Sequence, residues 1–456
     1  MTEYLVRTKL SSTTGEPDHV RLLDWAPGSR TATIQTGDTG AAFLDGWKTT
    51  QAAEELMLLG AVVYCTDKVT RRRDAADGWT RQIALRFPAE SVKQWPSEAF
   101  ESALSFLTGD HWTIQPYAAT HRPLAVTEDV EEMSGPPLGL GVDAVCLFSG
   151  GLDSLCGAID LLEEAPDRRL CLLSHHEGGQ ASTAQQILLD ALTAHYGQER
   201  FISRRFFLRP APVNKHQARP LPRARENTTR SRSFLFLSVA TALAAADGPA
   251  TPVIVPENGF IGVNVPLTRA RVGSASTRTT HPHFFERYET ATAALGVANP
   301  LNNPYRLQTK GEMLARSRNP TLLRALAPLS VSCSHPETAR YVGRRQGNCG
   351  YCFPCLIRRA SLAHVGWDNT EYAYDVFSDA DRELLLGGRS RRGADLRAVL
   401  MAASADAPDR DVLRNGPLPP GERAAFTAVW RRGLAELRSW LQSGNDKFGR
   451  VIGSAR

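Results

Sequence analysis

The 456-residue sequence has neither a long apolar run nor an export signal. No window holds about eighteen uncharged apolar residues in succession, the length that a membrane-spanning helix needs. The opening residues MTEYLVRTKL lack the basic and then apolar segments of a secretory signal. Internal repeats and long low-complexity tracts are also missing. We therefore expect a soluble, cytoplasmic protein without a membrane partner, built from two or three domains.

Acidic residues are scarce in one part of the chain. Residues 201–232 contain nine Arg or Lys residues and a single acid, Glu226, whereas the formal net charge of the whole chain is only +5. Such a stretch favours a polyanion, which is ATP, RNA or an acidic protein surface. A solvated basic loop explains the same composition.

Cysteines are few, and half of them are clustered. Four of the eight lie in apolar contexts, which favours buried thiols: Cys65, Cys146, Cys156 and Cys171. The other four follow the spacing C-x15-C-x2-C-x2-C: Cys333, Cys349, Cys352 and Cys355. Without an export signal, this cluster favours a metal over disulfides. Four thiolates close a tetrahedral structural Zn²⁺ site, and an iron-sulfur cluster is the alternative.

Strand and helix patterns alternate from residue 142 onward. Apolar runs predict strands at 144–148, 170–173, 201–208 and 253–255, and the runs between them predict helices at 152–164, 180–196 and 231–246. This order favours an α/β fold with a doubly wound, mostly parallel sheet, whose ligands bind at the carboxyl ends of the strands. Helical patterns follow residue 368, notably at 381–403 and 421–442, with a Pro-rich break at 417–420.

The region before this alternation has a different pattern. Short runs of mixed period, such as 61–64 and 82–87, predict an α+β domain, and the Pro- and Gly-containing stretch 127–141 predicts a linker. We therefore expect an N-terminal α+β domain at 1–138, which is a candidate for docking a partner. A central domain at 139–368 and a C-terminal helical extension at 369–456 complete the chain.

The sharpest motif is the string Ser149-Gly150-Gly151-Leu152-Asp153-Ser154, which joins a predicted strand to a predicted helix. Two glycines let the backbone approach an anion, and the serines and first helix amides supply donors at the positive end of the helix dipole. A tight turn alone would explain a glycine pair, but the complete string favours phosphate. The Gly-Lys-Ser/Thr end of a Walker loop is absent.

This string resembles the pyrophosphate loop of the ATP pyrophosphatases (PP-loop, adenine nucleotide hydrolase-like fold), which split ATP between the α- and β-phosphates and transfer AMP to a substrate oxygen. The resemblance implies that residues 149–154 bind ATP and that Asp153 holds the Mg²⁺ that bridges the phosphates.

Loop and cysteines together resemble the QueC family, the 7-cyano-7-deazaguanine synthases, whose hallmark is SGGxDS upstream of CGxCxxCxxR. Here that ending covers residues 349–358. The segments Arg230-Ser231-Arg232-Ser233 and Thr309-Lys310-Gly311-Glu312 also look like family elements, and the resemblance spans residues 142–366.

Departures from the family pattern indicate a specialised relative. The gap between Cys333 and Cys349 is longer than in housekeeping QueC, and the N-terminal and C-terminal regions are additional. Residues 256–264 and 276–282 are similar to QatC, the QueC-like family of the Qat anti-phage defence systems.

QueC enzymes, as the resemblance implies, adenylate the carboxylate of 7-carboxy-7-deazaguanine, let ammonia displace AMP, and adenylate again to reach the nitrile. Because the carboxylate and the α-phosphate are both anions, nearby cations lower the barrier to their reaction. The candidate cations, each of which also fits a surface role, are Arg230, Arg232, Arg271, Arg278, Lys310 and Arg358. We assign catalysis to Asp153, Lys310, Glu257 and Arg278, and nucleotide binding to Ser149, Gly150, Gly151, Leu152, Asp153, Ser154, Arg232 and Ser233.

Several assignments keep an ordinary alternative. Glu257 follows the predicted strand 253–255, where it would orient a guanine-like edge or take a proton from an amine, but an acid capping a turn fits as well. His175 and His176 end a strand where an adenine or ribose pocket would lie. His281 and His283 sit at a Pro turn, and ordinary turn histidines are the simpler interpretation.

The final acceptor stays open. The additional regions favour the amino group of a co-encoded partner protein over ammonia. A tRNA-modifying PP-loop enzyme, acting through a base adenylate, fits the basic stretch 201–232, although thiolation would need a free reactive cysteine. A third hypothesis is a nucleotide-binding module without turnover, against which the intact Asp153 and both serines argue.

Overall fold

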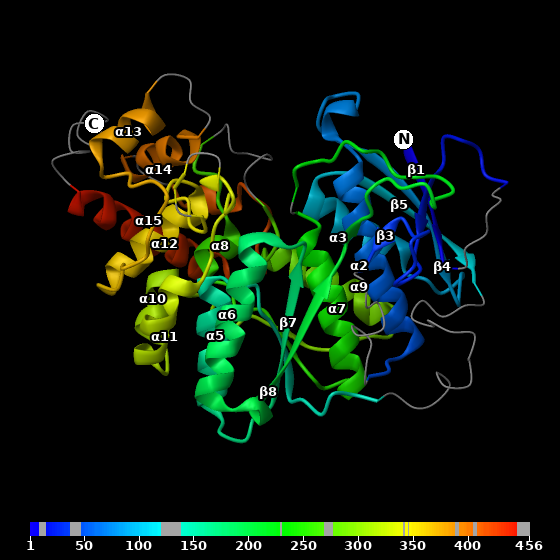
Figure 1. Ribbon diagram of the computed structural model, residues 1–456, viewed down its shortest axis with the longest axis horizontal. Helices are drawn as coiled ribbons and strands as arrows, with labels where there is room; N and C mark the ends of the chain where they lie inside the picture. The colour runs from blue at the N-terminus through cyan, green and yellow to red at the C-terminus, as the bar shows by residue number, and fades with distance from the viewer. Residues whose placement is uncertain are drawn as a thin grey trace.

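The computed structural model of the chain describes residues 1–8, 15–36, 47–119, 138–228, 230–268, 277–340, 343–344, 346–387, 392–404 and 408–444. Arg271, Ser276 and most of the predicted linker 127–141 lie outside these described residues. In Figure 1 the N-terminal sheet lies on the right, the central sheet and its helices in the middle, and the C-terminal helices on the left.

Five strands form the central sheet in the order β11-β10-β6-β7-β8, and each neighbouring pair is parallel. They are β6 (Ala144–Leu147), β7 (Leu170–His176), β8 (Phe201–Phe207), β10 (Val253–Ile254) and β11 (Leu301–Asn302). The chain adds β7 and β8 on one side of β6 and then returns to its other side with β10. This reversal makes the sheet doubly wound and confirms the predicted α/β class with a parallel sheet.

Helices connect these strands close to the predicted positions. The first three are α5 (Leu152–Glu164), α6 (Gly179–Tyr196) and α7 (Arg232–Asp247). Further helices follow β10 and β11: α8 (Gly259–Val263), α9 (Pro282–Ala294), α10 (Lys310–Ala315), α11 (Pro320–Leu326) and α12 (Phe353–His364).

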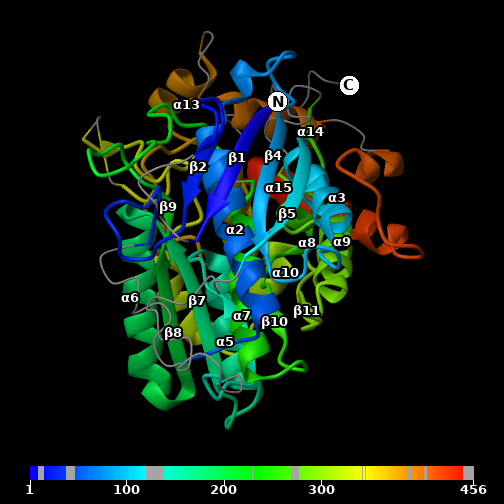
Figure 2. The ribbon, with the colours of Figure 1, turned by 90° about the vertical axis from the view of Figure 1, so that its right-hand side faces the viewer.

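A second parallel sheet forms the N-terminal region, with strand order β2-β1-β4-β5. Its elements are β1 (Thr2–Arg7), β2 (Arg21–Asp24), α2 (Gln51–Val69), β4 (Gln82–Ala89), α3 (Ser97–Thr108) and β5 (His111–Ala118). Figure 2 shows these four strands side by side in front of α2. The pairing is α/β rather than the α+β arrangement we predicted. Residues 61–64 lie inside α2, because a short apolar run fits a buried helix as well as a strand.

Helix α7 joins the two sheets, since it contacts β6, β7 and β10 on one side and α2 on the other. The apolar residues of α7 lie on all sides of the helix and are buried, as expected for an internal helix. The helices approach closely at Gly60, where an added Cβ would lie 2.7 Å from the Cβ of Ser238. A short antiparallel pair, β3 (Ile34–Gln35) with β9 (Arg209–Pro210), ties the N-terminal region to the central one. One hydrophobic core therefore includes residues of both regions.

The C-terminal helices are α13 (Asp379–Leu386), α14 (Ala394–Ser404) and α15 (Arg423–Ser443). The helical pattern at 381–403 is thus divided between two helices, and α13 ends before Gly387. A second core packs α15 and α14 against α12 and α8 and includes buried cysteines of the cluster.

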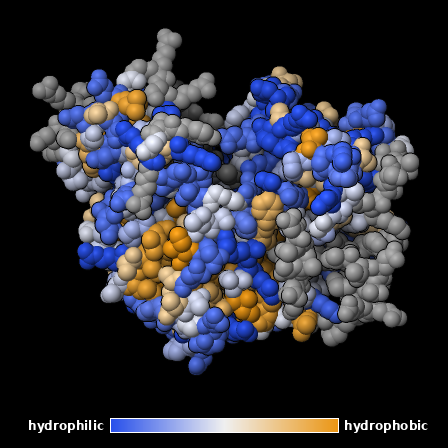
Figure 3. Space-filling model, in the orientation of Figure 1, coloured by the Kyte–Doolittle hydropathy of each residue, from blue (hydrophilic) through white to orange (hydrophobic). Residues whose placement is uncertain are grey.

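The described helices include none with the length and apolarity required to cross a bilayer. Polar residues cover most of the face in Figure 3, and apolar residues form small patches near its centre.

Candidate functional site

The candidate site lies at one end of the central sheet, at the point where the strand order reverses. Strands β6 and β10 are parallel neighbours, with Val253 opposite Val145, so their carboxyl ends meet at one edge. The SGGLDS loop follows β6, and Glu257 and Asn258 follow β10. Ligands of doubly wound sheets bind where the strand order reverses, and both candidate segments lie at that point.

Gly150 gives the loop a conformation that other residues rarely adopt. Its φ is +79°, and an added Cβ would lie 2.9 Å from Cγ of Gln185 on α6. The Gln185 carboxamide also donates to the Ser149 carbonyl over 3.1 Å. At the other side of the loop the hydroxyls of Ser149 and Ser154 lie 3.2 Å apart. The loop is therefore fixed against α6, and Ser149 stays exposed at the start of α5.

Asp153 is the centre of a buried polar cluster. The Lys310 ammonium lies 2.8 Å from Asp153 Oδ1, and both side chains are less than a tenth exposed. On the other oxygen, Oδ2, the Asn258 carboxamide donates over 2.7 Å and the Asn258 backbone amide over 3.2 Å. The same carboxamide donates to Glu257 over 3.1 Å. Three catalytic candidates, Asp153, Glu257 and Lys310, are thus brought together from three distant segments.

The two carboxyl groups of this cluster have opposite pKa shifts. Burial opposes the ionisation of Asp153, but the Lys310 ammonium and the hydrogen bonds from Glu257 and Asn258 together outweigh it and hold the pKa of Asp153 below its usual range. Burial raises the pKa of Glu257 well above its usual range, and the neighbouring charge of Asp153 raises it further. Asp153 therefore ionises more readily than Glu257, which holds its proton more tightly.

Local capping explains why these side chains lie where they do. Asn258 is the N-cap of α8, where its side-chain oxygen accepts from the Ile261 amide, so its nitrogen is left to face Asp153. Thr309 and Glu312 form a capping box that begins α10 at Lys310. Our sequence analysis gave Asn258 no role; the only signal was its place before a glycine at a strand end.

The nucleotide-binding candidates Arg232 and Ser233 lie at the start of α7. Arg232 donates to Nδ1 of His175 over 3.2 Å and to the His175 carbonyl over 2.8 Å, so it holds the end of β7. Ser233 donates to the Arg230 carbonyl. Burial, and then the charge of Arg232, lowers the pKa of His175 well below its usual range. His175 is therefore a neutral core side chain, whereas His176 is partly exposed.

Three other candidate cations donate to segments other than α5, the helix that carries Asp153. Arg358 is fully buried and donates to Ser330 over 2.7 Å. Arg230 donates to the Thr108 carbonyl of α3 and lies over the Trp79 ring. Arg278, assigned to catalysis from the sequence, donates to the Phe106 carbonyl over 2.8 Å and stacks on the Phe106 ring. Sequence proximity to a motif does not distinguish such buried structural arginines from ligand-binding ones.

The predicted turn histidines have structural roles. His281 is buried and is the N-cap of α9, where its Nδ1 accepts from the His283 amide. His283 accepts from Arg287 one turn along the same helix. The simpler interpretation of these two histidines therefore holds.

The four clustered cysteines converge as predicted. The sulfur atoms of Cys333, Cys349, Cys352 and Cys355 all lie within 4.8 Å of one another. Two of the separations are 3.8 Å, between Cys333 and Cys352, and 3.9 Å, between Cys349 and Cys355. Zinc bonds of about 2.3 Å in a tetrahedron separate the sulfurs by about 3.8 Å, so the cluster could hold a metal ion such as zinc.

The segment that enters this cluster also holds the phosphate loop. The Val331 amide donates to the Gly150 carbonyl over 2.9 Å, and the Leu152 amide donates to the Ser332 hydroxyl over 3.0 Å. Asn348 in turn accepts from the Ser332 amide and donates to the Ser330 carbonyl. The cysteine cluster and the phosphate loop are therefore attached through residues 330–332.

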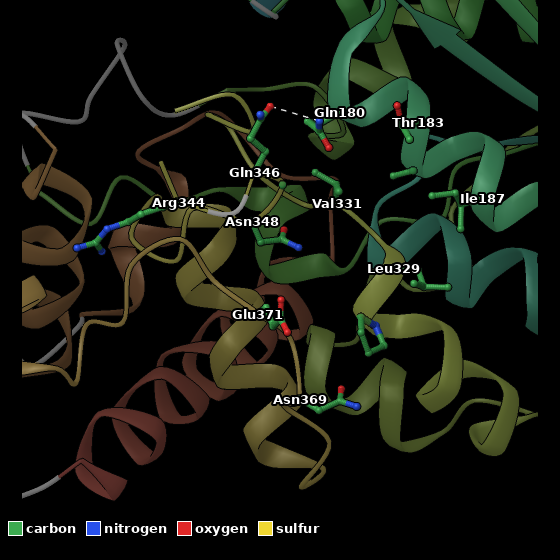
Figure 4. A pocket seen from close by; sticks show the side chains of 13 residues that line it. Gln180, Thr183, Ile187, Leu329, Val331, Arg344, Gln346, Asn348, Asn369 and Glu371 are labelled. Atoms are coloured by element: carbon green, nitrogen blue, oxygen red, sulfur yellow. Dashed lines mark hydrogen bonds between the residues drawn. The ribbon is translucent and has the colours of Figure 1, made fainter. Parts of the chain in front are cut away.

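A cavity of about 580 Å³ lies beside this attachment, between α6 and the segments 328–331 and 346–348. Figure 4 shows the carboxamides of Gln180, Gln346 and Asn348 on one side and the apolar side chains of Ile187 and Leu329 on another. Val331 is shared by the cavity and the loop contact. Arg344 and Glu371 also line the cavity, so it offers charged as well as uncharged polar groups next to the loop.

No protein-family model, curated protein or solved structure matches this chain. Its function is therefore inferred from the geometry of the phosphate loop, the Asp153 cluster and the cysteine cluster.

Proposed function

We propose that this chain is an ATP-dependent ligase that joins AMP to a small-molecule carboxylate and then passes the acyl group to an amine. The observation that carries this proposal is the pairing of Lys310 with Asp153, which lies in the first turn of α5 at the end of the SGGLDS string. Phosphates held by the loop and a cation held by Asp153 would meet there.

In the first step, a carboxylate oxygen of the substrate bonds to the α-phosphorus of ATP, the α-β bridge breaks, and pyrophosphate leaves. The loop amides, Ser149 and Ser154 hold the phosphates. Lys310 reduces the repulsion between the two anions that react. Asp153 would hold Mg²⁺, which would neutralise phosphate charge.

In the second step, the amine nitrogen bonds to the activated carbonyl carbon, and AMP leaves with one oxygen of the original carboxylate. The amine loses a proton in this step. We assign the acceptance of that proton to the ionised form of Glu257, because its raised pKa makes it a stronger base and it lies beside Asp153.

We propose 7-carboxy-7-deazaguanine, or a close relative, as the substrate, and a place in the QueC-like family near QatC, in cytoplasmic anti-phage defence. The order of the SGGxDS, RSRS, TKGE and CGxCxxCxxR segments supports this assignment. The acceptor is ammonia or the amino group of a partner protein, and Zn²⁺ is structural in the four-cysteine cluster.

RNA is a weaker candidate ligand because the basic stretch is engaged elsewhere. Arg225 donates to Ala211 within the stretch, and four of its arginines donate to other segments: Arg205 to Ser182, Arg209 to Gln35, Arg219 to Val20 and Arg230 to Thr108. These contacts hold the central region to its neighbours and leave fewer cations for a phosphate backbone.

The test is incubation of the protein with ATP, Mg²⁺ and 7-carboxy-7-deazaguanine, with and without ammonia, followed by mass spectrometry and pyrophosphate measurement. We expect substrate-dependent pyrophosphate and AMP, with the amide or nitrile formed when ammonia is present. Asp153→Asn is the matched inactive control. Folded, metal-loaded protein that releases no pyrophosphate with this substrate would contradict the substrate assignment, and salt-sensitive tRNA binding would favour the tRNA-modifying alternative.

A further inference from the structure

The C-terminal helix α15 contacts both segments that meet Asp153. One is the start of α10, which carries Lys310, and the other is α8, which directly follows Asn258. Lys310 and Asn258 bind opposite oxygens of the Asp153 carboxylate. A single helix from the end of the chain therefore touches the supports of both partners of Asp153.

On the Lys310 side, the contact is made by Glu436. Its carboxylate accepts a hydrogen bond from the Thr309 hydroxyl and one of 3.3 Å from the Gly311 amide, so it binds the residues on both sides of Lys310. An added Cβ at Gly311 would lie 2.6 Å from Glu436, which shows how closely the two segments approach. Ser361 of α12 donates to the same carboxylate over 3.4 Å.

A second contact extends this attachment by one helical turn. Arg432 donates to Glu312 over 2.6 Å and to the Leu307 carbonyl over 3.0 Å. Residues 307–312 are thus held at four positions by α15. The helix that carries Lys310 is only six residues long, and a helix of that length is not stable without tertiary contacts.

On the Asn258 side, the contact is apolar and close. An added Cβ at Gly433 would lie 2.3 Å from the Phe260 ring, so α15 packs directly on α8. An added Cβ at Gly259 would lie 2.1 Å from the Arg306 carbonyl oxygen and 3.1 Å from Val429 of α15. Neither glycine can carry a side chain without separating these segments.

We propose that α15 is a positioning element for the Asp153 cluster, and that Glu436 is the positioning residue that fixes Lys310 against Asp153. The catalytic consequence rests on the proposed function, whereas the structural consequence does not. When Glu436 is removed, the Thr309 hydroxyl and the Gly311 amide lose their acceptor. The first turn of α10 then loosens, and Lys310 separates from Asp153 more often.

Chemical labelling of Lys310 tests this without any substrate. The ammonium of Lys310 is buried and paired, so an amine-acylating reagent labels it slowly in the wild type. We expect Glu436→Ala to raise the labelling rate of Lys310 about tenfold, as for the loss of a buried hydrogen-bonded acceptor. Peptide mass spectrometry measures the rate, and Asp153→Asn, which removes the counter-ion, is the positive control.

Arg438→Ala is the matched control on the same helix. Arg438 donates to the Ala403 carbonyl of α14 and so holds α15 without touching α10. We expect this variant to leave Lys310 labelling within twofold of the wild type. Lys68 of α2, which pairs with Glu177 of the central region, is the internal reference for folding. If Lys68 labelling also rises in Glu436→Ala, the Glu436→Gln variant is used in place of Glu436→Ala. Gln retains an acceptor for Thr309 but none for Gly311, so we expect a smaller rise in the labelling rate of Lys310.

Activity then provides a second readout. With wild-type turnover established, we expect Glu436→Ala to lower kcat for pyrophosphate release about tenfold and to leave KM for ATP nearly unchanged, because the phosphate loop is untouched. Equal Lys310 labelling in the wild type and in folded Glu436 variants would overturn the positioning role. A wild type that releases no pyrophosphate would contradict the proposed function. The labelling result would still test the positioning role of Glu436, because it needs no substrate.

Discussion

The hydroxyl of Ser332 accepts a hydrogen bond of 3.0 Å from the amide of Leu152, the first residue of α5. Ser332 directly precedes Cys333, so the segment that enters the cysteine cluster also holds the end of the phosphate loop. The neighbouring bond from Val331 to Gly150 strengthens this attachment. A metal in the cluster would therefore order the loop as well as its own ligands.

Loss of the metal site should weaken both features. We expect Cys352→Ala to lose a bound metal equivalent, to melt at a lower temperature, and to bind ATP about tenfold more weakly, the worth of one well-formed hydrogen bond. Metal analysis and ATP titration measure these effects. Cys65→Ala, at a buried cysteine of α2 outside the cluster, should retain the metal. Full metal content in Cys352→Ala would exclude the four-cysteine site.

Gly150 should be indispensable for the shape of the loop. Gly150→Ala adds backbone strain of about 1–2 kcal/mol and a Cβ against Gln185, so we expect lower stability and at least tenfold weaker ATP binding. Gly78→Ala is the control, because Gly78 also has a positive φ, of +69°, with no atom within 4 Å of an added Cβ. It should lose similar stability and keep ATP affinity. Equal ATP affinity in both variants would show that the loop does not bind the nucleotide.

The buried pair of Asp153 and Lys310 should show strong coupling. Lys310→Met leaves a buried charge without its partner and should cost about 3–5 kcal/mol of unfolding free energy. In the double variant with Asp153→Asn that charge is absent, so we expect part of the loss to be recovered. Denaturant unfolding of the four proteins gives the coupling energy. Additive effects would mean that the two side chains do not interact.

His281 should make the fold sensitive to acid. Burial, and then the charge of Arg278, lowers the pKa of His281 to about 3, against about 6.5 in an unfolded chain. Between these values the unfolded chain binds a proton that the folded chain excludes, so stability falls as the pH decreases from 6.5 toward 3. His281→Asn keeps an N-cap acceptor and should reduce the slope of the unfolding free energy against pH by about 1.4 kcal/mol per pH unit. Unfolding at pH 6 and pH 4.5 measures it, and identical slopes would contradict a buried neutral His281.

Much of the central fold was predictable because its signals are local. Alternating apolar and helical runs fixed the strand and helix positions, and the glycine pair in the SGGLDS string marked the turn after β6. The spacing of the cysteines predicted their convergence, because two of the intervals are too short to separate the ligands in space. Strand pairing in the N-terminal region depends on long-range contacts and was not predictable from such runs.

The roles of single polar residues were harder to predict. Arg358 and Lys310 are both buried cations within motifs, yet Arg358 donates to a backbone carbonyl and two hydroxyls, whereas Lys310 faces Asp153. That difference depends on the tertiary environment, which the spacing of residues does not encode. The contribution of Glu436 arises between segments more than a hundred residues apart, so no local pattern could indicate it.

The most direct test follows the oxygen atoms of the substrate carboxylate. The protein is incubated with ATP, Mg²⁺, an amine and 7-carboxy-7-deazaguanine labelled with ¹⁸O in its carboxylate. The mass of the AMP formed is then measured by mass spectrometry. Attack of the carboxylate on the α-phosphorus predicts AMP that carries one heavy oxygen, with none formed by Asp153→Asn. AMP without heavy oxygen, or ADP in its place, would contradict activation of the carboxylate as its adenylate.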